Sequence, residues 1–558
     1  MIQQQARSSR HHARRVVFAL CFLFALAGVI AASALLLNHA PAQDSRRANI
    51  IIPNVDDDNG DGLPDGMAPV VQGAADEEML QMRIKPGLAL PQPAMVRVEI
   101  AEPWTRFARA FIGDSAAGGF QLIQGTVAVN SDEVMRNGVL IGIEASDFAD
   151  AGRPPALEFK ISFETREGRS IHEETVKCSV APFLISCCLD PVDSVHVIKT
   201  EPTEQFVADL APLVQAAGAE LRAFKDAALP KFDIWIQDAT EIGLATDGLR
   251  LMHVALHGNR GKKLDDLFAR KFLGKDFGVI QKGKYRGDWA QWIDWFGNLE
   301  VSPPVKVHGR EFPHGRIYAG TQGQRAMHPD VIRFLEAQGA QAPVLWLDTS
   351  WLIIGHVDET VSWVPSRVDR SYRMLIPSAR LAVEILKKTE EDAPGGLLNR
   401  GTKREGDAPG EYERPLAEAL SNKDLMATQE LVQKKIDGVR RTLQEGLGVA
   451  DQDIIEIPVL FSSPWEKYAG RTCTETTNMV NGLLVGSTFI VPDPHGPLVN
   501  GKDVLLQAVK DRLEPLGCRV VAVDNFYPYH RFLGEVHCGT NATRQKDCRS
   551  LPGRTGEI

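Results

Sequence analysis

The feature that most constrains the fold is an alternation of helical and extended patterns that begins near residue 196. Amphipathic helices are predicted at 203–221, 378–391 and 423–447, where apolar residues recur three or four positions apart. Between and after them lie apolar runs typical of buried strands, such as FDIWIQD, APVLWLD, NGLLVGSTFIV and CRVVAVDN. Strands that alternate with helices predict an α/β domain over residues 196–558.

Residues 45–195 show a different pattern, with short extended runs and little helical periodicity. The runs include AMVRVEIA, FQLIQGTVAV, GVLIGIEA, ALEFKISF and VAPFLISC, separated by turn residues. Closely spaced runs of this kind predict a small β-sandwich. The chain therefore divides into a β-sandwich followed by an α/β domain.

The segment NVDDDNGDGLPDG, at the start of the predicted sandwich, is dense in oxygen ligands. Its candidate calcium ligands are Asn54, Asp56 and Asp58 in one register, or Asp57, Asn59 and Asp61 in the other, followed by Asp65. A tight loop with alternating carboxylates turns several of them toward a hard cation. A solvated acidic turn is the alternative, and the loop lacks the final glutamate of an EF-hand.

The first 44 residues are predicted to be an export segment, either a cleaved signal peptide or a membrane anchor. Arg14 and Arg15 precede an apolar run at 16–37, and Ala40-Pro41-Ala42 follows it. The run is long enough to span a bilayer, so the anchor remains an alternative. In both cases the remainder of the chain is expected outside the cytoplasm, as a secreted, periplasmic or anchored protein.

Charge and cysteine content limit the function further. The formal net charge of -10 over 558 residues argues against non-specific nucleic-acid binding, which needs a basic surface. Outside the export segment there are seven cysteines, an odd number, so at least one is unpaired or intermolecular. Cys538 is either a reactive thiol or a disulfide partner of Cys518 or Cys548.

Three clusters in the α/β domain carry potential chemistry. They contain Asp238 at the end of a predicted strand, His356 and Asp358 on one face of another, and Cys538 in GEVHCGTN. A thiolate is a nucleophile, a histidine transfers protons, and two carboxylates can bind one planar guanidinium. A structural His–Asp pair or two metal ligands would explain His356 and Asp358 equally well.

Four blocks carry a resemblance to a known family. FDIWIQDATEIG, the stretch from DFGVIQKG to FPHGRIYAG, WLIIGHVDETVSWVP and GEVHCGTN follow the order seen in the peptidylarginine deiminases. The resemblance runs from about residue 196 to 545. It implies a pentein α/β propeller of five strand-helix modules, preceded by an immunoglobulin-like calcium-binding sandwich.

The resemblance also implies roles for individual residues. Cys538 would be the nucleophile of a covalent thiouronium intermediate, His356 the general acid and base, and Asp238 and Asp358 the guanidinium ligands. Trp235 would form an aromatic wall and Arg260 would bind the substrate backbone. The implied calcium ligands beside the active centre are Gln237, Glu241, Phe296, Leu299 and Glu300.

The implied activity is calcium-dependent conversion of arginine in proteins or peptides to citrulline and ammonia. Two alternatives stay open on the sequence. One is an exported hydrolase of free arginine or another small guanidino compound, and the other is a catalytically silent calcium-binding interaction module.

Overall fold

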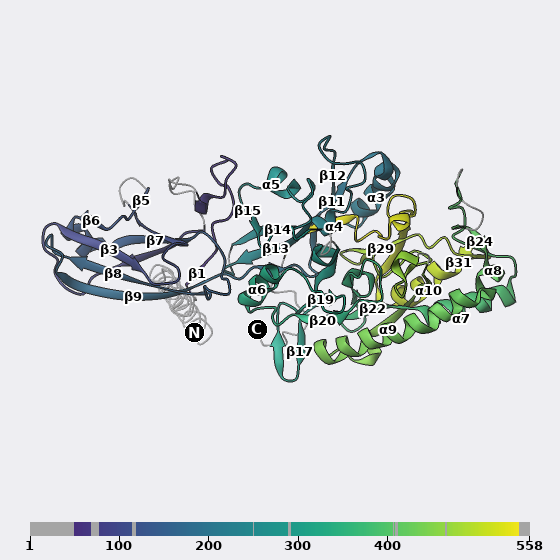
Figure 1. Cartoon of the computed structure of the whole chain (residues 1–558). Helices are drawn as coiled ribbons and strands as arrows, with labels where there is room; N and C mark the ends of the chain where they lie inside the picture. Colours follow the sequence, from purple (N-terminus) through teal and green to yellow (C-terminus); the bar gives the residue numbers. More distant parts are fainter. Residues whose placement is uncertain are drawn as a thin grey trace, which may run out of the picture. The chain divides into compact units, whose positions relative to one another are not determined.

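The computed structural model describes residues 49–67, 78–113, 119–248, 250–287, 292–404, 407, 411–463 and 466–545 (Figure 1). The predicted export segment and Cys548 lie outside these residues. In the described part of the chain, no helix combines the length and apolar character needed to cross a membrane. From Ile50 onward the described residues belong to one compact unit.

Two sheets near the amino terminus pack around one core. The five-stranded sheet has the order β1 (Ile50–Ile51), β9 (Ser170–Val180), β8 (Ala156–Glu164), β3 (Ala94–Ile100) and β6 (Thr126–Val129). The other has the order β2 (Leu80–Ile84), β7 (Val139–Ala145), β4 (Ala108–Gly113) and β5 (Phe120–Leu122). Both contribute alternate side chains to the core, including Phe159 and Ile161 from one and Ile141 and Ile143 from the other. A two-sheet sandwich is therefore present, whereas its immunoglobulin-like class stays a prediction.

Five further sheets repeat one pairing pattern. In each, a first strand pairs antiparallel with a second, and a helical crossover leads to a third strand that pairs parallel with the second. The first four trios are β13 (Thr240–Thr246), β14 (Leu251–His257) and β15 (Phe277–Gln281); β16 (Leu299–Val301), β19 (Ile317–Thr321) and β20 (Leu345–Asp348); β21 (Ser362–Ser366), β22 (Ser371–Ser378) and β25 (Ile454–Pro458); and β28 (Leu483–Val485), β29 (Thr488–Pro492) and β32 (Arg519–Val523). This arrangement agrees with the predicted five-module architecture.

The fifth module joins distant parts of the chain. Its first strand is β33 (Thr540–Arg544), and its other two are β11 (Val192–Ile198) and β12 (Glu220–Phe224). Upstream of β11, the strand β10 (Leu184–Ile185) pairs with β13 rather than with the sandwich. The α/β sheets therefore begin before residue 196, because VAPFLISC, assigned to the sandwich from its extended pattern, finds its partner in the first module.

The crossover helices have the caps and apolar faces expected from the sequence. They are α3 (Glu204–Ala216), α5 (Leu267–Lys271), α6 (Pro329–Gln338), α7 (Ala379–Asp392), α9 (Lys423–Leu447) and α10 (Val504–Leu513), with α8 (Leu416–Ser421) between α7 and α9. Asn422 caps α9 by accepting hydrogen bonds from the N–H groups of Asp424 and Leu425, and Gly448 ends it in the left-handed conformation. Helices α7 and α9 lie side by side (Figure 1). The helices predicted at 378–391 and 423–447 are confirmed within one residue at their ends. The helix predicted at 203–221 ends at Ala216, and Glu220 and Leu221 belong to β12.

Candidate active site

The candidate catalytic residues come from equivalent places in the modules. Short segments precede the first strands: α4 (Ile236–Ala239) before β13, η6 (Phe296–Asn298) before β16, η7 (Val357–Glu359) before β21, residues 478–481 before β28, and Cys538 before β33. Asp238 lies in α4, and His356 and Asp358 lie at η7. Repetition of one module therefore explains how residues far apart in sequence reach one site.

Two local predictions are wrong. Asp238 does not end a strand, because α4 precedes β13, and GHVDE is not a strand but the start of the 3-10 helix η7. The apolar residues that suggested strands are buried around these turns instead; Val357, for example, has no exposed surface. The side chains converge through their turns rather than along one strand face.

The four predicted catalytic side chains meet around Gly297. A Cβ atom at this glycine would lie 2.6 Å from Nδ1 of His356, 2.8 Å from Oδ1 of Asp238 and 3.1 Å from Oδ2 of Asp358. The same oxygen of Asp358 lies 3.4 Å from Sγ of Cys538. The absence of a side chain at Gly297 therefore lets both carboxylates and the imidazole face one point.

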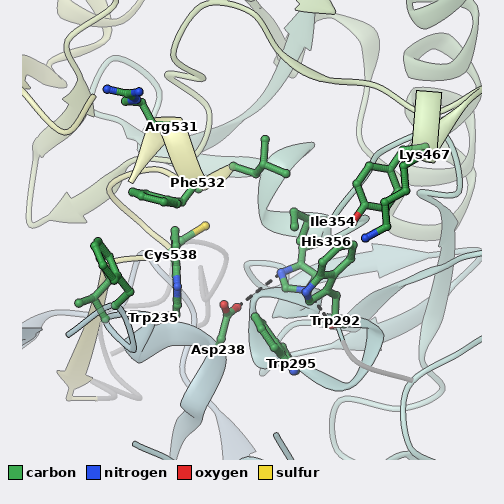
Figure 2. A pocket seen from close by; sticks show the side chains of 15 residues that line it. Trp235, Asp238, Trp292, Trp295, Ile354, His356, Lys467, Arg531, Phe532 and Cys538 are labelled. Carbon is green, nitrogen blue, oxygen red and sulfur yellow. Dashed lines mark hydrogen bonds and ion pairs between the residues drawn. The ribbon is translucent and has the colours of Figure 1, made fainter. Parts of the chain in front are cut away.

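A cavity of about 590 Å³ opens onto this point (Figure 2). Asp238, His356 and Cys538 are nearly fully buried and form its floor, and its walls are mainly aromatic. The aromatic lining residues are Phe232, Trp235, Trp292, Trp295, Tyr468 and Phe532. Trp235 thus lies on the cavity wall, and its contact with a substrate stays a prediction.

The imidazole of His356 is fixed from two sides. Its Nε2 donates a hydrogen bond to the carbonyl oxygen of Trp292 at 2.7 Å, since that oxygen can only accept. Its Nδ1 faces Oδ1 of Asp238 at 3.5 Å (Figure 2). The backbone N–H of His356 donates to a side-chain oxygen of Glu359 at 2.9 Å. One ring nitrogen is therefore directed into the site.

The electrostatics of the floor favour a cation. Burial raises the pKa of the Cys538 thiol well above its usual range, and Asp358 and Asp238 raise it further. Burial also raises the pKa of Asp238, while His356 and Arg260 lower it in part. Since positive charge would relieve both effects, the site is suited to a guanidinium.

Arg260 is not brought to the cavity. Its side chain has no exposed surface, and its guanidinium lies 2.9 Å from Oδ1 of Asp233 and 2.6 Å from Oδ1 of Asp265. It also stacks on Trp295 at 5.2 Å. In this arrangement two buried carboxylates hold the guanidinium away from the cavity, and the role of Arg260 in binding the substrate backbone stays a prediction.

A second, smaller cavity of about 40 Å³ adjoins the active site. It is lined by Gln237, Glu241, Glu300, His537 and Arg544, among others, whereas Phe296 and Leu299 do not reach it. Burial raises the pKa of Glu241, which Glu300 raises further, and burial raises that of Glu300 to about 7. The carboxylates of Glu241 and Glu300 and the amide oxygen of Gln237 are ligands that a hard cation can bind, although His537 and Arg544 line the same cavity and His537 already pairs with Glu300.

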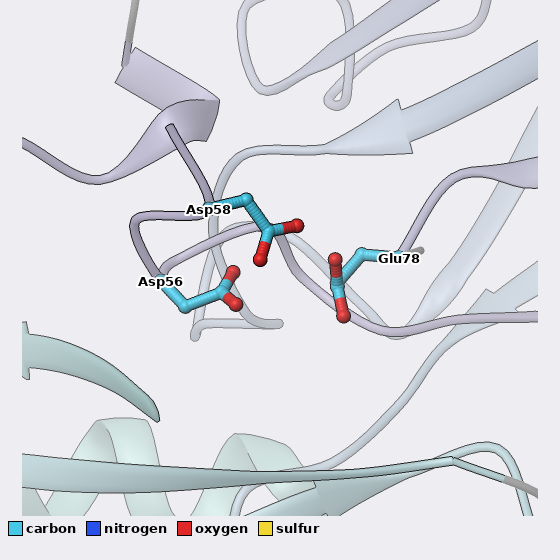
Figure 3. Close-up of side chains that lie close together, drawn as sticks. All are labelled: Asp56, Asp58 and Glu78. Atoms are coloured by element: carbon cyan, nitrogen blue, oxygen red, sulfur yellow. The ribbon is translucent and has the colours of Figure 1, made fainter. Parts of the chain in front are cut away.

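The acidic loop of the sandwich gathers only part of its predicted ligand set. Carboxylate oxygens of Asp56, Asp58 and Glu78 lie within 4.8 Å of one another (Figure 3). Burial and the neighbouring Asp58 raise the pKa of Asp56 to about 7. Glu78 was missed because nothing in the spacing of the loop links it to a residue twenty positions later.

The other predicted loop ligands have different partners. The side chain of Asn54 donates to Glu144 at 2.8 Å. Asp65 accepts from the N–H of Asp58 at 2.7 Å, and the exposed Asp61 accepts from the N–H of Leu63 at 2.9 Å. Asp61 and Asp65 shape the loop and are not members of the three-carboxylate cluster.

Two residues beside the nucleophile were not predicted. Asn481 accepts from the N–H of Cys538 at 3.3 Å, and its Oδ1 lies 3.5 Å from Sγ. His537 lies between Asp358 and Glu300, at 3.1 and 3.3 Å. Burial opposes its protonation, but Glu300 and Asp358 raise its pKa to about 9. Asn481 occupies the equivalent position in the fourth module, a signal visible only once the modules are known.

Cys538 is a free thiol in the structure, and so is Cys518, its possible disulfide partner. Cys538 is 5% exposed and faces the main cavity. This geometry suits a nucleophile.

Comparison with known proteins gives a consistent result. A family model described as protein-arginine deiminase (PAD) matches residues 170–549. The chain is 34% identical over 420 residues to protein-arginine deiminase type-4 of Mus musculus, and 35% identical over 418 residues to type-3 of Homo sapiens. Each alignment covers 72% of this chain but 61% of the relative, so the chain spans less than two thirds of their length.

Solved structures show a weaker likeness. An agmatine deiminase of C. jejuni matches with a TM-score of 0.36 and 15% identity, covering 65% of this chain and 96% of that one. A structure titled as a putative peptidyl-arginine deiminase matches with a TM-score of 0.39 and 12% identity, covering 65% of this chain and 99% of the other.

Proposed function

This chain belongs to the protein-arginine deiminase family, and from that premise we propose that it hydrolyses the guanidinium of arginine to a ureido group. The observation that carries the proposal is the convergence of four side chains. Cys538, His356 and Asp238 line the cavity, and Asp358 lies beside them, with its Oδ2 3.4 Å from Sγ of Cys538. The products are a citrulline residue and ammonia.

Substrate binding follows from the charges of the floor. Asp238 and Asp358 present buried carboxylates that a planar guanidinium can satisfy with paired hydrogen bonds. The free-energy cost of removing the guanidinium from water is offset by its attraction to these two carboxylates, which are themselves poorly solvated. The bound cation also favours the thiolate of Cys538, because it opposes the two carboxylates that raise the thiol pKa.

The chemistry then needs one nucleophile and one proton carrier. Sγ of Cys538 attacks the guanidinium carbon, and His356 carries the thiol proton to the departing nitrogen, which leaves as ammonia. A thiouronium intermediate remains bound to Cys538. Water attacks the same carbon, His356 accepts its proton, the C–S bond breaks, and citrulline is released.

Calcium is proposed as the resident cation of the smaller cavity. Gln237, Glu241 and Glu300 would hold it there, and a divalent charge would neutralise the two adjacent carboxylates. Gln237 directly precedes Asp238 in α4, so holding Gln237 also orients the substrate carboxylate. Asp56, Asp58 and Glu78 form a second candidate calcium site in the two-sheet sandwich.

Calcium binding is tested by thermal melting with and without calcium. Wild-type protein is expected to melt at a higher temperature with calcium, and a Glu241→Gln/Glu300→Gln variant should lose most of that increase. Asp56→Asn/Asp58→Asn reports the sandwich site separately. Identical melting of wild type with calcium and with chelator contradicts the proposal.

Arginine in peptides is the proposed substrate, with free arginine as the alternative. The cavity mouth carries the exposed rings of Phe232 and Phe532, 50% and 48% exposed and 5.4 Å apart. Exposed aromatic rings beside the catalytic floor favour contact with residues that flank the arginine. Export of the protein to the outside of the cytoplasm stays a proposal that rests on the arginine-flanked apolar run.

The deciding experiment measures citrulline from an arginine peptide and from free arginine, with calcium present. Turnover of the peptide supports the proposed function. Turnover of free arginine alone supports a small-molecule hydrolase. Citrulline from neither supports a silent calcium-binding module and overturns the proposal.

A further inference from the structure

The mouth of the main cavity carries positive charge opposite its acidic floor. Two basic side chains, Lys467 and Arg531, line the cavity together with the aromatic rings. Lys467 is exposed and Arg531 is half-buried, whereas Asp238 and Cys538 are buried below them. When a substrate places its guanidinium on the floor, the substrate groups next to the arginine therefore lie near these two cations.

Arg531 is already engaged by its own surroundings. Its guanidinium lies 3.2 Å from Oδ1 of Asp407 and stacks on Tyr412 and Tyr527, at 4.5 and 5.1 Å from the ring centroids. In Figure 2 it points away from the catalytic side chains. Its charge is largely balanced, and it contributes little to recognition of a substrate.

Lys467 is different, because no carboxylate of the described residues pairs with it. It lies in η9 (Glu466–Tyr468), and its ammonium is 5.2 Å from the ring of Tyr468. Figure 2 shows the ammonium directed into the cavity. Within the described part of the chain, no carboxylate lies within 4.0 Å of it. Among the described residues, Lys467 is thus a cation of the cavity lining without a paired carboxylate, and Asp238 is a carboxylate on the cavity floor.

We propose that Lys467 selects arginines that carry a carboxylate next to them. The proposal rests on the proposed deiminase function. A carboxylate adjacent to the arginine would pair with Lys467 once the guanidinium reaches the floor. Because Lys467 is exposed, this pair would have the modest strength of a surface ion pair. The carboxylate is either the side chain of a neighbouring acidic residue or the α-carboxylate of a carboxyl-terminal arginine.

The test compares kcat/KM for acetylated peptides that differ in one group. One set places Asp or Asn beside the arginine in amidated peptides, and another ends in arginine as the free acid or the amide. Wild type is expected to prefer the acidic member of at least one pair by about fivefold at low ionic strength. The pair that shows the preference identifies the source of the carboxylate.

Variants assign the preference to one side chain. Lys467→Gln should reduce the ratio of kcat/KM for the acidic peptide to kcat/KM for the neutral peptide to about one. Lys467→Glu should reverse the preference, because the carboxylate then faces a like charge instead of an ion-pair partner. Lys306→Gln removes an exposed lysine paired with Glu311 outside the cavity lining, and it should keep the wild-type ratio.

The outcomes distinguish failure of this proposal from failure of the proposed deiminase function on which it rests. Turnover of neutral peptides with no acidic preference, or a preference unchanged in Lys467→Gln, overturns the selection by Lys467 alone. If no peptide yields citrulline, the deiminase function fails and the selection fails with it.

Discussion

Sγ of Cys538 lies 3.4 Å from Oδ2 of Asp358, a residue 180 positions earlier in the chain. The thiol donates to a carboxylate that also accepts from His537 at 3.1 Å. Because a carboxylate beside a thiol raises the thiol pKa, we expect Cys538 to stay protonated until a cation arrives. Under the proposed function, this contact would link substrate binding to activation of the nucleophile.

Asp358→Asn should therefore change two measurements in opposite directions. Loss of the guanidinium ligand is expected to lower kcat/KM by about 100-fold or more. Without substrate, iodoacetamide should alkylate Cys538 faster, because removing the negative charge lowers the thiol pKa. Asp511→Asn, at an exposed site on α10, is the matched control. Slower alkylation together with lost turnover would point to a damaged fold instead.

Asn481 is expected to act as a positioning residue. Its side chain holds the backbone N–H of Cys538 at 3.3 Å, so Asn481→Ala should lower kcat by about 10- to 100-fold and leave KM within about twofold. The pH dependence of the alkylation rate of Cys538 should also differ between Asn481→Ala and wild type. The control Asn422→Ala removes the cap of α9 and should cost about 1 kcal/mol of stability without affecting kcat. Unchanged kcat in Asn481→Ala would refute this role.

Arg260 should contribute to stability rather than to substrate binding. Arg260→Leu leaves Asp233 and Asp265 buried without their cation, and is expected to destabilise the fold by about 3–5 kcal/mol. Arg250→Leu breaks a more exposed pair with Asp247 and should cost about 1 kcal/mol or less. Urea titrations measure both. A raised KM with unchanged stability in Arg260→Leu would restore the predicted contact with substrate.

Glu359 should make stability depend on pH. Burial, together with Asp358, raises its pKa to about 8, so the folded protein keeps it protonated where the unfolded chain would ionise it. The contribution of Glu359 to the free energy of unfolding is therefore complete at low pH and is lost as the pH rises toward about 8. Between about pH 5 and 8, the melting temperature should fall more in wild type than in Glu359→Gln. Equal slopes would contradict the raised pKa.

Much of the architecture could be predicted from local patterns. Helix α9 has its apolar residues three and four positions apart, with Asn422 before it and Gly448 after it, and its bounds agree with the prediction. The pairing of β10 with β13 in the first module could not be predicted, because the sequence of an extended run does not determine which strand it pairs with. For the same reason the sandwich was predicted to extend about ten residues too far.

The candidate site could also be predicted only in part, because the sequence indicates which residue types carry the chemistry but not all of their partners in space. Cys538, His356, Asp238 and Asp358 were predicted as one site from their chemical types and the family resemblance, and the structure brings them together. The burial of Arg260 depends on Asp233 and Asp265, which have no signal of their own in the sequence. Glu78 joins Asp56 and Asp58 only because of the loop's path in space.

The most direct measurement is citrulline formation from an arginine peptide by wild type and Cys538→Ala, with calcium present. The proposed chemistry passes through a bond to Sγ, so the variant should form no citrulline above the uncatalysed rate while still folding and binding the peptide. Citrulline formed by Cys538→Ala at a rate near that of wild type would contradict the account.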